Sequence, residues 1–249
     1  MSGHSKWSTI KRKKAAMDAR KGQLFTKLAR ELAVAARQGG GDPDTNFTLR
    51  LVVDKAKAAN MPKENIERAI QRGTGELKGE ALEEIMYEGY APHGVALLVQ
   101  VLTDNRNRTV ADLRRVLTRQ GGRLGEIGSV AWQFERKGYI AIPRDDQDVD
   151  TIFDTAVEAG ADDVVLGDDL IEVYTAIIDF QTVQEALSKA GVPIDNAELA
   201  MIPNAPLQLG EGETIKVMGV IEALEELDDV QQVYSNLDIS DEVMAKYEG

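Results

Sequence analysis

Lysine, arginine and one tryptophan are concentrated at the start of the chain, in MSGHSKWSTIKRKKAAMDARK. The residues of these types in this N-terminal basic segment, residues 1–21, are Lys6, Trp7, Lys11, Arg12, Lys13, Lys14, Arg20 and Lys21. A dense cationic patch binds phosphate largely by releasing counterions, and an indole ring can stack on a base. The segment is therefore predicted to bind nucleic acid. The alternative is a solvated tail with Trp7 packed on a neighbouring helix.

Charge is distributed unevenly along the chain, whose net charge is −13. Residues 1–75 hold 16 basic and 7 acidic side chains, residues 76–136 hold 8 and 9, and residues 137–249 hold 5 and 26. Such asymmetry between segments favours polyanion binding at the basic end. The acidic end would be repelled by the same polyanion, so we expect it to face away.

Two further groups of cations follow the N-terminal basic segment. The first helix is predicted to carry Lys27, Arg30 and Arg37. A second predicted helix, in TDNRNRTVADLRRVLTRQGG, carries Arg106, Arg108, Arg115 and Arg119. The last three are seven and four residues apart and share a helical face, and guanidinium groups bind phosphate through paired hydrogen bonds. The alternative is an exposed face paired with Asp104, Asp112 and Glu126.

Composition argues against an enzyme. Cysteine is absent, so thiolate chemistry, disulfides and cysteine-based zinc sites are excluded, and the two histidines leave little imidazole for metal binding or acid–base work. No P-loop, HExxH or GxSxG spacing occurs, and the acidic runs fit turns and helix caps better than cation sites. We expect no cofactor, no metal and no small-molecule substrate, and a magnesium-dependent nuclease is the weakest alternative.

With no run of 18 apolar residues, no membrane span is expected, and a cytoplasmic location is predicted.

Apolar spacing predicts helices first and strands later. Leu24, Leu28, Leu32 and Ala36 recur every four residues and form one helical stripe before Gly39. A second helix is expected to open at Pro43-Asp44, and a third to follow Pro62 and stop at Gly73. These helices can bury their stripes only against each other, so residues 1–75 are predicted to form a three-helix bundle.

The remaining chain predicts two α/β domains, one inserted in the other. ALEEIMYEGY, GVALLVQVL and SVAWQFE read as strands around the arginine-rich helix. Residues 137–206 then follow a β-α-β-β-α-β order, which is typical of a ferredoxin-like domain. The helix and strand after residue 206 cannot bury their faces alone. We therefore predict an α+β protein in which residues 80–136 and 207–249 form one domain around the inserted acidic domain 137–206.

Sequence motifs along essentially the whole chain resemble the YebC/PmpR family, which includes mitochondrial translational activators of cytochrome oxidase. They are GHSKW, IKRKKAA, DARKG, FTKLARE, GGGDP, MPKENIERAIQRGTGE, YEGYAPHG, TDNRNRT and GGRLGEIGSVAWQF. Ala91 and His93 depart from the family's YEGYGPGG. The resemblance implies a helical N-terminal bundle with two α/β domains. It also implies nucleic-acid contact through the TDNRNRT arginines and through the region from GHSKW to Lys21, which includes His4.

These observations predict a nucleic-acid-binding regulator of gene expression. The family's transcriptional members make a DNA-binding regulator the first hypothesis. Its translational members make a ribosome-associated factor, which binds ribosomal RNA and relieves stalls at proline-rich sequences, the alternative. Phosphate contacts look alike on DNA and RNA, so the sequence separates the two poorly.

Overall fold

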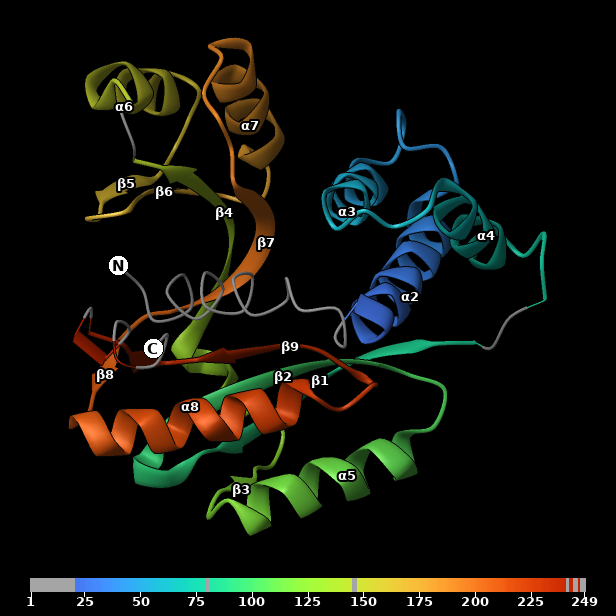
Figure 1. Cartoon of the computed structure of the whole chain (residues 1–249), viewed down its shortest axis with the longest axis vertical. Helices are drawn as coiled ribbons and strands as arrows, with labels where there is room; N and C mark the ends of the chain where they lie inside the picture. Colours follow the sequence, from blue (N-terminus) through green and yellow to red (C-terminus); the bar gives the residue numbers. More distant parts are fainter. Residues whose placement is uncertain (1–20, 79–80, 145–146, 241, 244–245, 247–249) are drawn as a thin grey trace.

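The computed structural model describes residues 21–78, 81–144, 147–240, 242–243 and 246. It shows an α+β protein in which a helical part lies beside two antiparallel sheets, each with its own helices (Figure 1). The predicted α+β class is confirmed. No helix in the described ranges is both long and apolar enough to span a bilayer.

The helical part contains α2 (Lys21–Gly39), α3 (Phe47–Ala58) and α4 (Lys63–Thr74). Their apolar faces meet in one core, as the leucine spacing of α2 predicts. Buried residues of this core include Leu28, Leu32, Leu49, Ile66 and Ala69. Isolated helices of 12 residues, such as α3 and α4, are marginally stable in water, so these two helices depend on packing against the rest of the helical part.

The start of α3 differs from the prediction that it opens at Pro43-Asp44. The helix begins at Phe47 because Asn46 caps it: the Asn46 side-chain oxygen accepts a hydrogen bond from the Leu49 backbone N–H at 3.0 Å. An asparagine in this place satisfies one of the N–H groups that a helix start leaves without a partner. The residues before it form a turn instead.

The end of α4 also differs from prediction, because Gly73 does not stop it. The helix continues to Thr74, and Gly75 ends it in the left-handed conformation, with φ of 84°. Gly73 has a different role. A Cβ at this position would overlap the carbonyl oxygen of Ala33 in α2, so the absence of a side chain lets α2 and α4 approach closely.

The first sheet has the strand order β3-β1-β2-β9. Its strands are β1 (Glu83–Tyr90), β2 (Ala96–Thr103), β3 (Arg123–Leu124) and β9 (Val230–Ser235). Helices α5 (Arg106–Arg119) and α8 (Glu211–Glu225) cover one face of it (Figure 1). Leu113 of α5 and Ile221 of α8 belong there to the same buried cluster as Val99 of β2. Beside this sheet, β8 (Leu207–Gln208) pairs with β10 (Leu237–Asp238).

The second sheet has the order β5-β6-β4-β7 and lies between β3 and β8 in the sequence. Its elements are β4 (Phe134–Pro143), α6 (Val149–Glu158), β5 (Asp163–Leu166), β6 (Leu170–Thr175), α7 (Phe180–Lys189) and β7 (Asn196–Pro203). Ile140, Ile171 and Phe180 are buried in its core. The Phe180 ring also meets Phe47 of α3 edge to face, with centroids 5.8 Å apart, so the helical part contacts this sheet directly.

The predicted strand SVAWQFE, residues 129–135, is wrong for most of its length. Ala131–Gln133 form a 3-10 turn, and β4 begins only at Phe134, where it pairs with β7 of the second sheet. Residues 128–131 do not form a strand because they bind a side chain of β1, that of Glu88. The Glu88 carboxylate accepts the backbone N–H groups of Gly128, Val130 and Ala131 at 2.6, 2.7 and 2.8 Å. These N–H groups are therefore not available for a strand ladder.

Replacing Glu88 with glutamine should lower the free energy of unfolding by about 2 kcal/mol, because charge-assisted hydrogen bonds are lost inside the protein. Burial alone would raise the pKa of Glu88, but the three N–H donors outweigh it and lower the pKa. The stabilisation is therefore present above the ordinary glutamate pKa and is lost as the pH falls through the lowered value. Chemical denaturation measures both effects. Glu126→Gln, an exposed change nearby, should stay within about 0.5 kcal/mol of the parent.

Candidate nucleic-acid interface

Most of the predicted N-terminal contact residues lie outside the described residues. They are His4, Lys6, Trp7, Lys11, Arg12, Lys13, Lys14 and Arg20. The described part begins at Lys21, an exposed residue that opens α2. The chain therefore passes from the N-terminal basic segment directly into the helical part.

One side of α2 contacts the C-terminal end of α8. The Lys27 Nζ donates to the carbonyl oxygen of Glu225 at 2.5 Å, and the Gln23 amide donates to that of Glu226 at 2.6 Å. The last carbonyls of a helix lack intrahelical partners and carry partial negative charge, which a lysine stabilises. Lys27 is buried at this contact. In this arrangement it joins the helical part to α8 and does not extend the exposed cationic surface.

Asp229, in the turn between α8 and β9, is the centre of the same junction. Its carboxylate pairs with Arg30 of α2 and with Arg108 of α5, both at 3.0 Å, and accepts the Thr109 hydroxyl at 2.7 Å. Burial alone would raise the pKa of Asp229, but the Thr109 hydrogen bond and the arginines hold it below its usual range. Arg30 and Arg108 thus act here as partners of a buried carboxylate.

The exposed side of α5 combines paired and available arginines. Arg106 pairs with Glu83, and Arg115 pairs with Asp112 at 2.9 Å. Arg119 has no side-chain partner within the part of the chain that the structure describes. Exposed ion pairs contribute only about 0–1 kcal/mol, so phosphate could replace these carboxylates. The arginines of α5 are therefore compatible both with an exposed, ion-paired face and with a phosphate-binding face.

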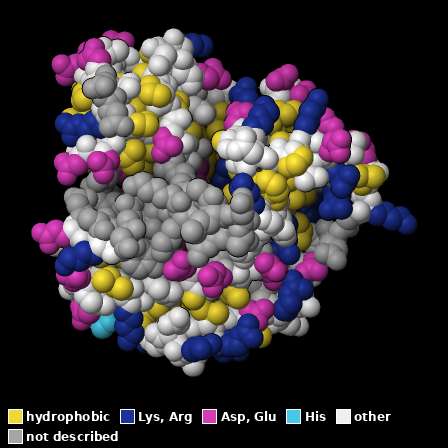
Figure 2. Space-filling model, viewed as in Figure 1, with side chains coloured by type: hydrophobic (Ala, Val, Ile, Leu, Met, Phe, Trp, Pro, Cys, Tyr) yellow, Lys and Arg dark blue, Asp and Glu magenta, His cyan; other side chains and the backbone are white. Residues whose placement is uncertain are grey.

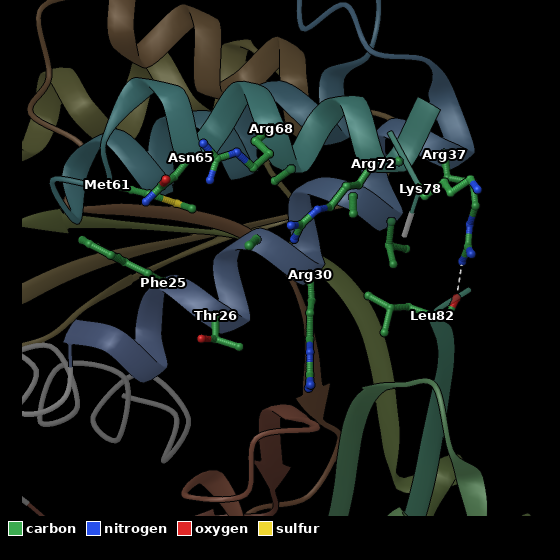
Figure 3. Close-up of a pocket in the computed structure, with 15 residues that line it drawn as sticks. Phe25, Thr26, Arg30, Arg37, Met61, Asn65, Arg68, Arg72, Lys78 and Leu82 are labelled. Carbon is green, nitrogen blue, oxygen red and sulfur yellow. Dashed lines mark hydrogen bonds between the residues drawn. The ribbon is translucent and has the colours of Figure 1, made fainter. Parts of the chain in front are cut away.

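A groove of about 620 Å³ lies between α2 and α4. Its cationic lining residues are Arg30, Arg37, Arg68, Arg72 and Lys78. No aspartate or glutamate is among the described residues that line it. Figure 3 shows Arg68 and Arg72 extending from α4 and Arg30 and Arg37 extending from α2. The groove is thus a cationic hollow in a protein that is acidic as a whole.

The cations of this groove differ in how strongly they are already engaged. Arg30 points away from the hollow toward Asp229, and Arg37 donates to the carbonyl oxygen of Leu82 (Figure 3). Arg68, Arg72 and Lys78 are exposed, and they make no side-chain hydrogen bond or ion pair within the described ranges. These three side chains are therefore free to bind an anion without giving up a described partner.

Arg68, Arg72 and Lys78 were not among the residues predicted from the sequence. Arg68 and Arg72 are four residues apart on α4, so they share a helical face, and that spacing is the signal that could have selected them. In the surface view, Lys and Arg side chains gather over the lobe of α2–α4 and along the lower edge at α5 (Figure 2). Acidic side chains are spread over the whole visible face, the lobe of α2–α4 included.

The fold and the groove together define an α+β protein with a cationic hollow on a helical N-terminal part. This chain belongs to the TACO1/YebC family, which confirms the predicted membership. The model of the TACO1/YebC protein N-terminal domain matches residues 5–76, and that of the TACO1/YebC second and third domain matches residues 82–237.

Similar proteins support the assignment over nearly the full length. A "Probable transcriptional regulatory protein" of Acidithiobacillus ferrooxidans is 54% identical, covering 100% of this chain and 99% of the relative. One from Persephonella marina is 53% identical and covers 99% of both. A crystal structure titled as a conserved hypothetical protein from Aquifex aeolicus is 48% identical, with a TM-score of 0.82 and coverage of 90% and 93%. The relatives from Acidithiobacillus ferrooxidans and Persephonella marina are both named as probable transcriptional regulatory proteins.

Proposed function

We propose that this protein regulates gene expression by binding nucleic acid through its basic N-terminal region, with DNA as the first candidate target. The observation that carries the proposal is the cationic groove of α2 and α4, which follows directly after the N-terminal basic segment in the chain. Phosphate backbones supply most of the affinity for such surfaces. The regulatory names of the relatives fit this activity. The proposal places the protein in the cytoplasm.

Within this proposal, each predicted group has a role. Lys11, Arg12, Lys13 and Lys14 bind phosphates, and Trp7 stacks on a base or sugar. His4, Lys6, Arg20 and Lys21 extend the same surface. Arg106, Arg115 and Arg119 of α5 form a second phosphate-binding face. Lys27 and Arg108 contribute indirectly: Lys27 holds the helical part against the end of α8, and Arg108 holds α5 against Asp229.

The second candidate is a ribosome-associated translation factor that binds ribosomal RNA. The observation that favours it is the concave shape of the groove between α2 and α4. Duplex DNA is usually read by an element that enters its major groove, whereas RNA is often recognised through unpaired segments that fit into the protein. Crosslinking in cells, followed by sequencing of the bound nucleic acid, separates the two. Promoter DNA supports the first candidate, ribosomal RNA supports the second, and recovery of neither contradicts both.

Replacing Lys11, Arg12, Lys13 and Lys14 with glutamate should weaken binding to all nucleic-acid sequences. Each phosphate contact that is lost should flatten the dependence of log affinity on log salt by about 1. The measurement is a titration of labelled DNA and RNA at several salt concentrations. Lys216→Glu also makes the protein more acidic, at an exposed site on α8, and should leave the slope unchanged. An unchanged slope in the first variant would show that these four residues are not part of the binding site.

A further inference from the structure

We propose that the groove between α2 and α4 holds a single-stranded segment of nucleic acid. Arg68, Arg72 and Lys78 would bind its phosphates, and one base would enter the hollow beside Phe25. This inference rests on the proposed function and specifies the strand form that the site accepts.

The two ends of the groove differ in chemistry. Figure 3 shows Phe25, Met61 and Asn65 at one end, whereas Arg37, Arg72 and Lys78 lie toward the other. An aromatic ring beside apolar atoms suits the flat face of a base, and an amide such as that of Asn65 can hydrogen-bond to a base edge. The cationic end suits phosphate. The groove therefore offers one end suited to a base and one end suited to backbone phosphates.

The apolar end is accessible to a base. The Phe25 side chain is only half-buried, although it packs against the core of the helical part. Its face thus borders the hollow while its other contacts hold it in place. Stacking on an aromatic side chain that is already positioned requires little further ordering of the protein. Base stacking of this kind does not depend on sequence, because every base has a π-face.

The walls of the groove are held in place. α2 and α4 touch at Gly73, where any Cβ would overlap the Ala33 carbonyl oxygen. The groove volume of about 620 Å³ lies within the range of about 300–1,000 Å³ that is typical of small-ligand pockets. Bases in a duplex are stacked and paired inside the helix, so a duplex could contact only the cationic rim. An unpaired base, by contrast, can leave its stack and enter such a hollow.

The test uses the full chain and three probes of one sequence: single-stranded RNA, single-stranded DNA and the DNA duplex. We expect the parent protein to bind a single strand more tightly than the duplex. Arg68→Glu with Arg72→Glu should lower single-strand affinity about tenfold and duplex affinity by a smaller factor, because a duplex can contact these arginines only from the rim of the groove. The RNA and DNA arms show which single strand the site prefers.

Two further variants make the test specific. Lys57→Glu with Lys63→Glu changes the same charge on exposed residues of the helical part outside the groove, and should leave single-strand affinity within about twofold. Phe25→Leu keeps an apolar side chain but removes the ring, and should weaken single-strand binding about tenfold without changing duplex binding. Circular dichroism melting confirms that each variant folds.

The outcomes separate this inference from the proposed function. If the parent binds nucleic acid but the groove variants bind all three probes as the parent does, the groove assignment is overturned and the proposed function stands. If single-strand and duplex affinities fall equally in the arginine variant, the preference for single strands is overturned. If the parent binds none of the probes, the proposed function fails, and this inference fails with it.

Discussion

Replacing Asp229 with asparagine should lower the free energy of unfolding by about 3 kcal/mol. The carboxylate pairs with Arg30 and Arg108 and accepts hydrogen bonds from Thr109 and Thr103. Removing one member of a buried ion pair costs about 3–5 kcal/mol, because the other charge is left without compensation. Arg108 is half exposed and can recover water, which places the expected loss at the lower end of that range.

Chemical denaturation at neutral pH measures this loss, and Asp228→Asn provides the matched control. Asp228 is the exposed neighbour, and only its backbone carbonyl contacts Arg30 among the described interactions. This control should change stability by less than about 0.5 kcal/mol. Equal stability of the two variants would show that Asp229 does not hold the junction between α2, α5 and β9.

The Asp229 effect should depend on pH in a defined direction. Its pKa is lowered in the folded protein, so folding favours the ionised form. The stabilisation is complete above the ordinary aspartate pKa of about 3.9 and is lost as the pH falls through the lowered folded value. The parent and Asp229→Asn should therefore converge in stability in strong acid, where both lack the charge. A difference that persists unchanged would point to packing instead.

Replacing Gly73 with alanine should lower the free energy of unfolding by about 1–2 kcal/mol. In a helix interior, alanine is intrinsically better than glycine by about 1 kcal/mol. At Gly73, however, the new methyl group would overlap the Ala33 carbonyl oxygen. Backbone on both sides has little room to yield, and overpacking of this kind costs about 1–3 kcal/mol. We expect the steric cost to exceed the helix preference, and α4 to move away from α2.

Gly219→Ala in α8 is the matched control, and it should have the opposite sign. Gly219 is also inside a helix, but a Cβ there meets no atom within 4 Å. Alanine should therefore raise stability by about 0.5–1 kcal/mol. Thermal and chemical unfolding of both variants measure the contrast. Stabilisation by both changes would show that α2 and α4 do not depend on their close contact at Gly73.

Much of the secondary structure follows from local pattern. The leucines of α2 at four-residue spacing predict an amphipathic helix, and β1 and β2 appear where alternating and apolar runs predict strands. Hydrophobic periodicity is a property of neighbouring residues, so it can be read without the fold. The predicted strand at residues 129–135 failed for the opposite reason. The Glu88 carboxylate, about 40 residues earlier in the chain, takes up the N–H groups that a strand would need.

The sequence by itself determined the α+β class, the family motifs and the cationic character of the N-terminal region. Only the tertiary structure decided which cations are available to a ligand. Lys27 and Arg30 look equivalent to other basic residues along the chain, yet folding engages them with Glu225 and Asp229, some 200 residues away. Arg68 and Arg72 instead line a groove without a described partner. The physical reason is that charge is a local property of the chain, whereas pairing and burial depend on contacts between distant segments.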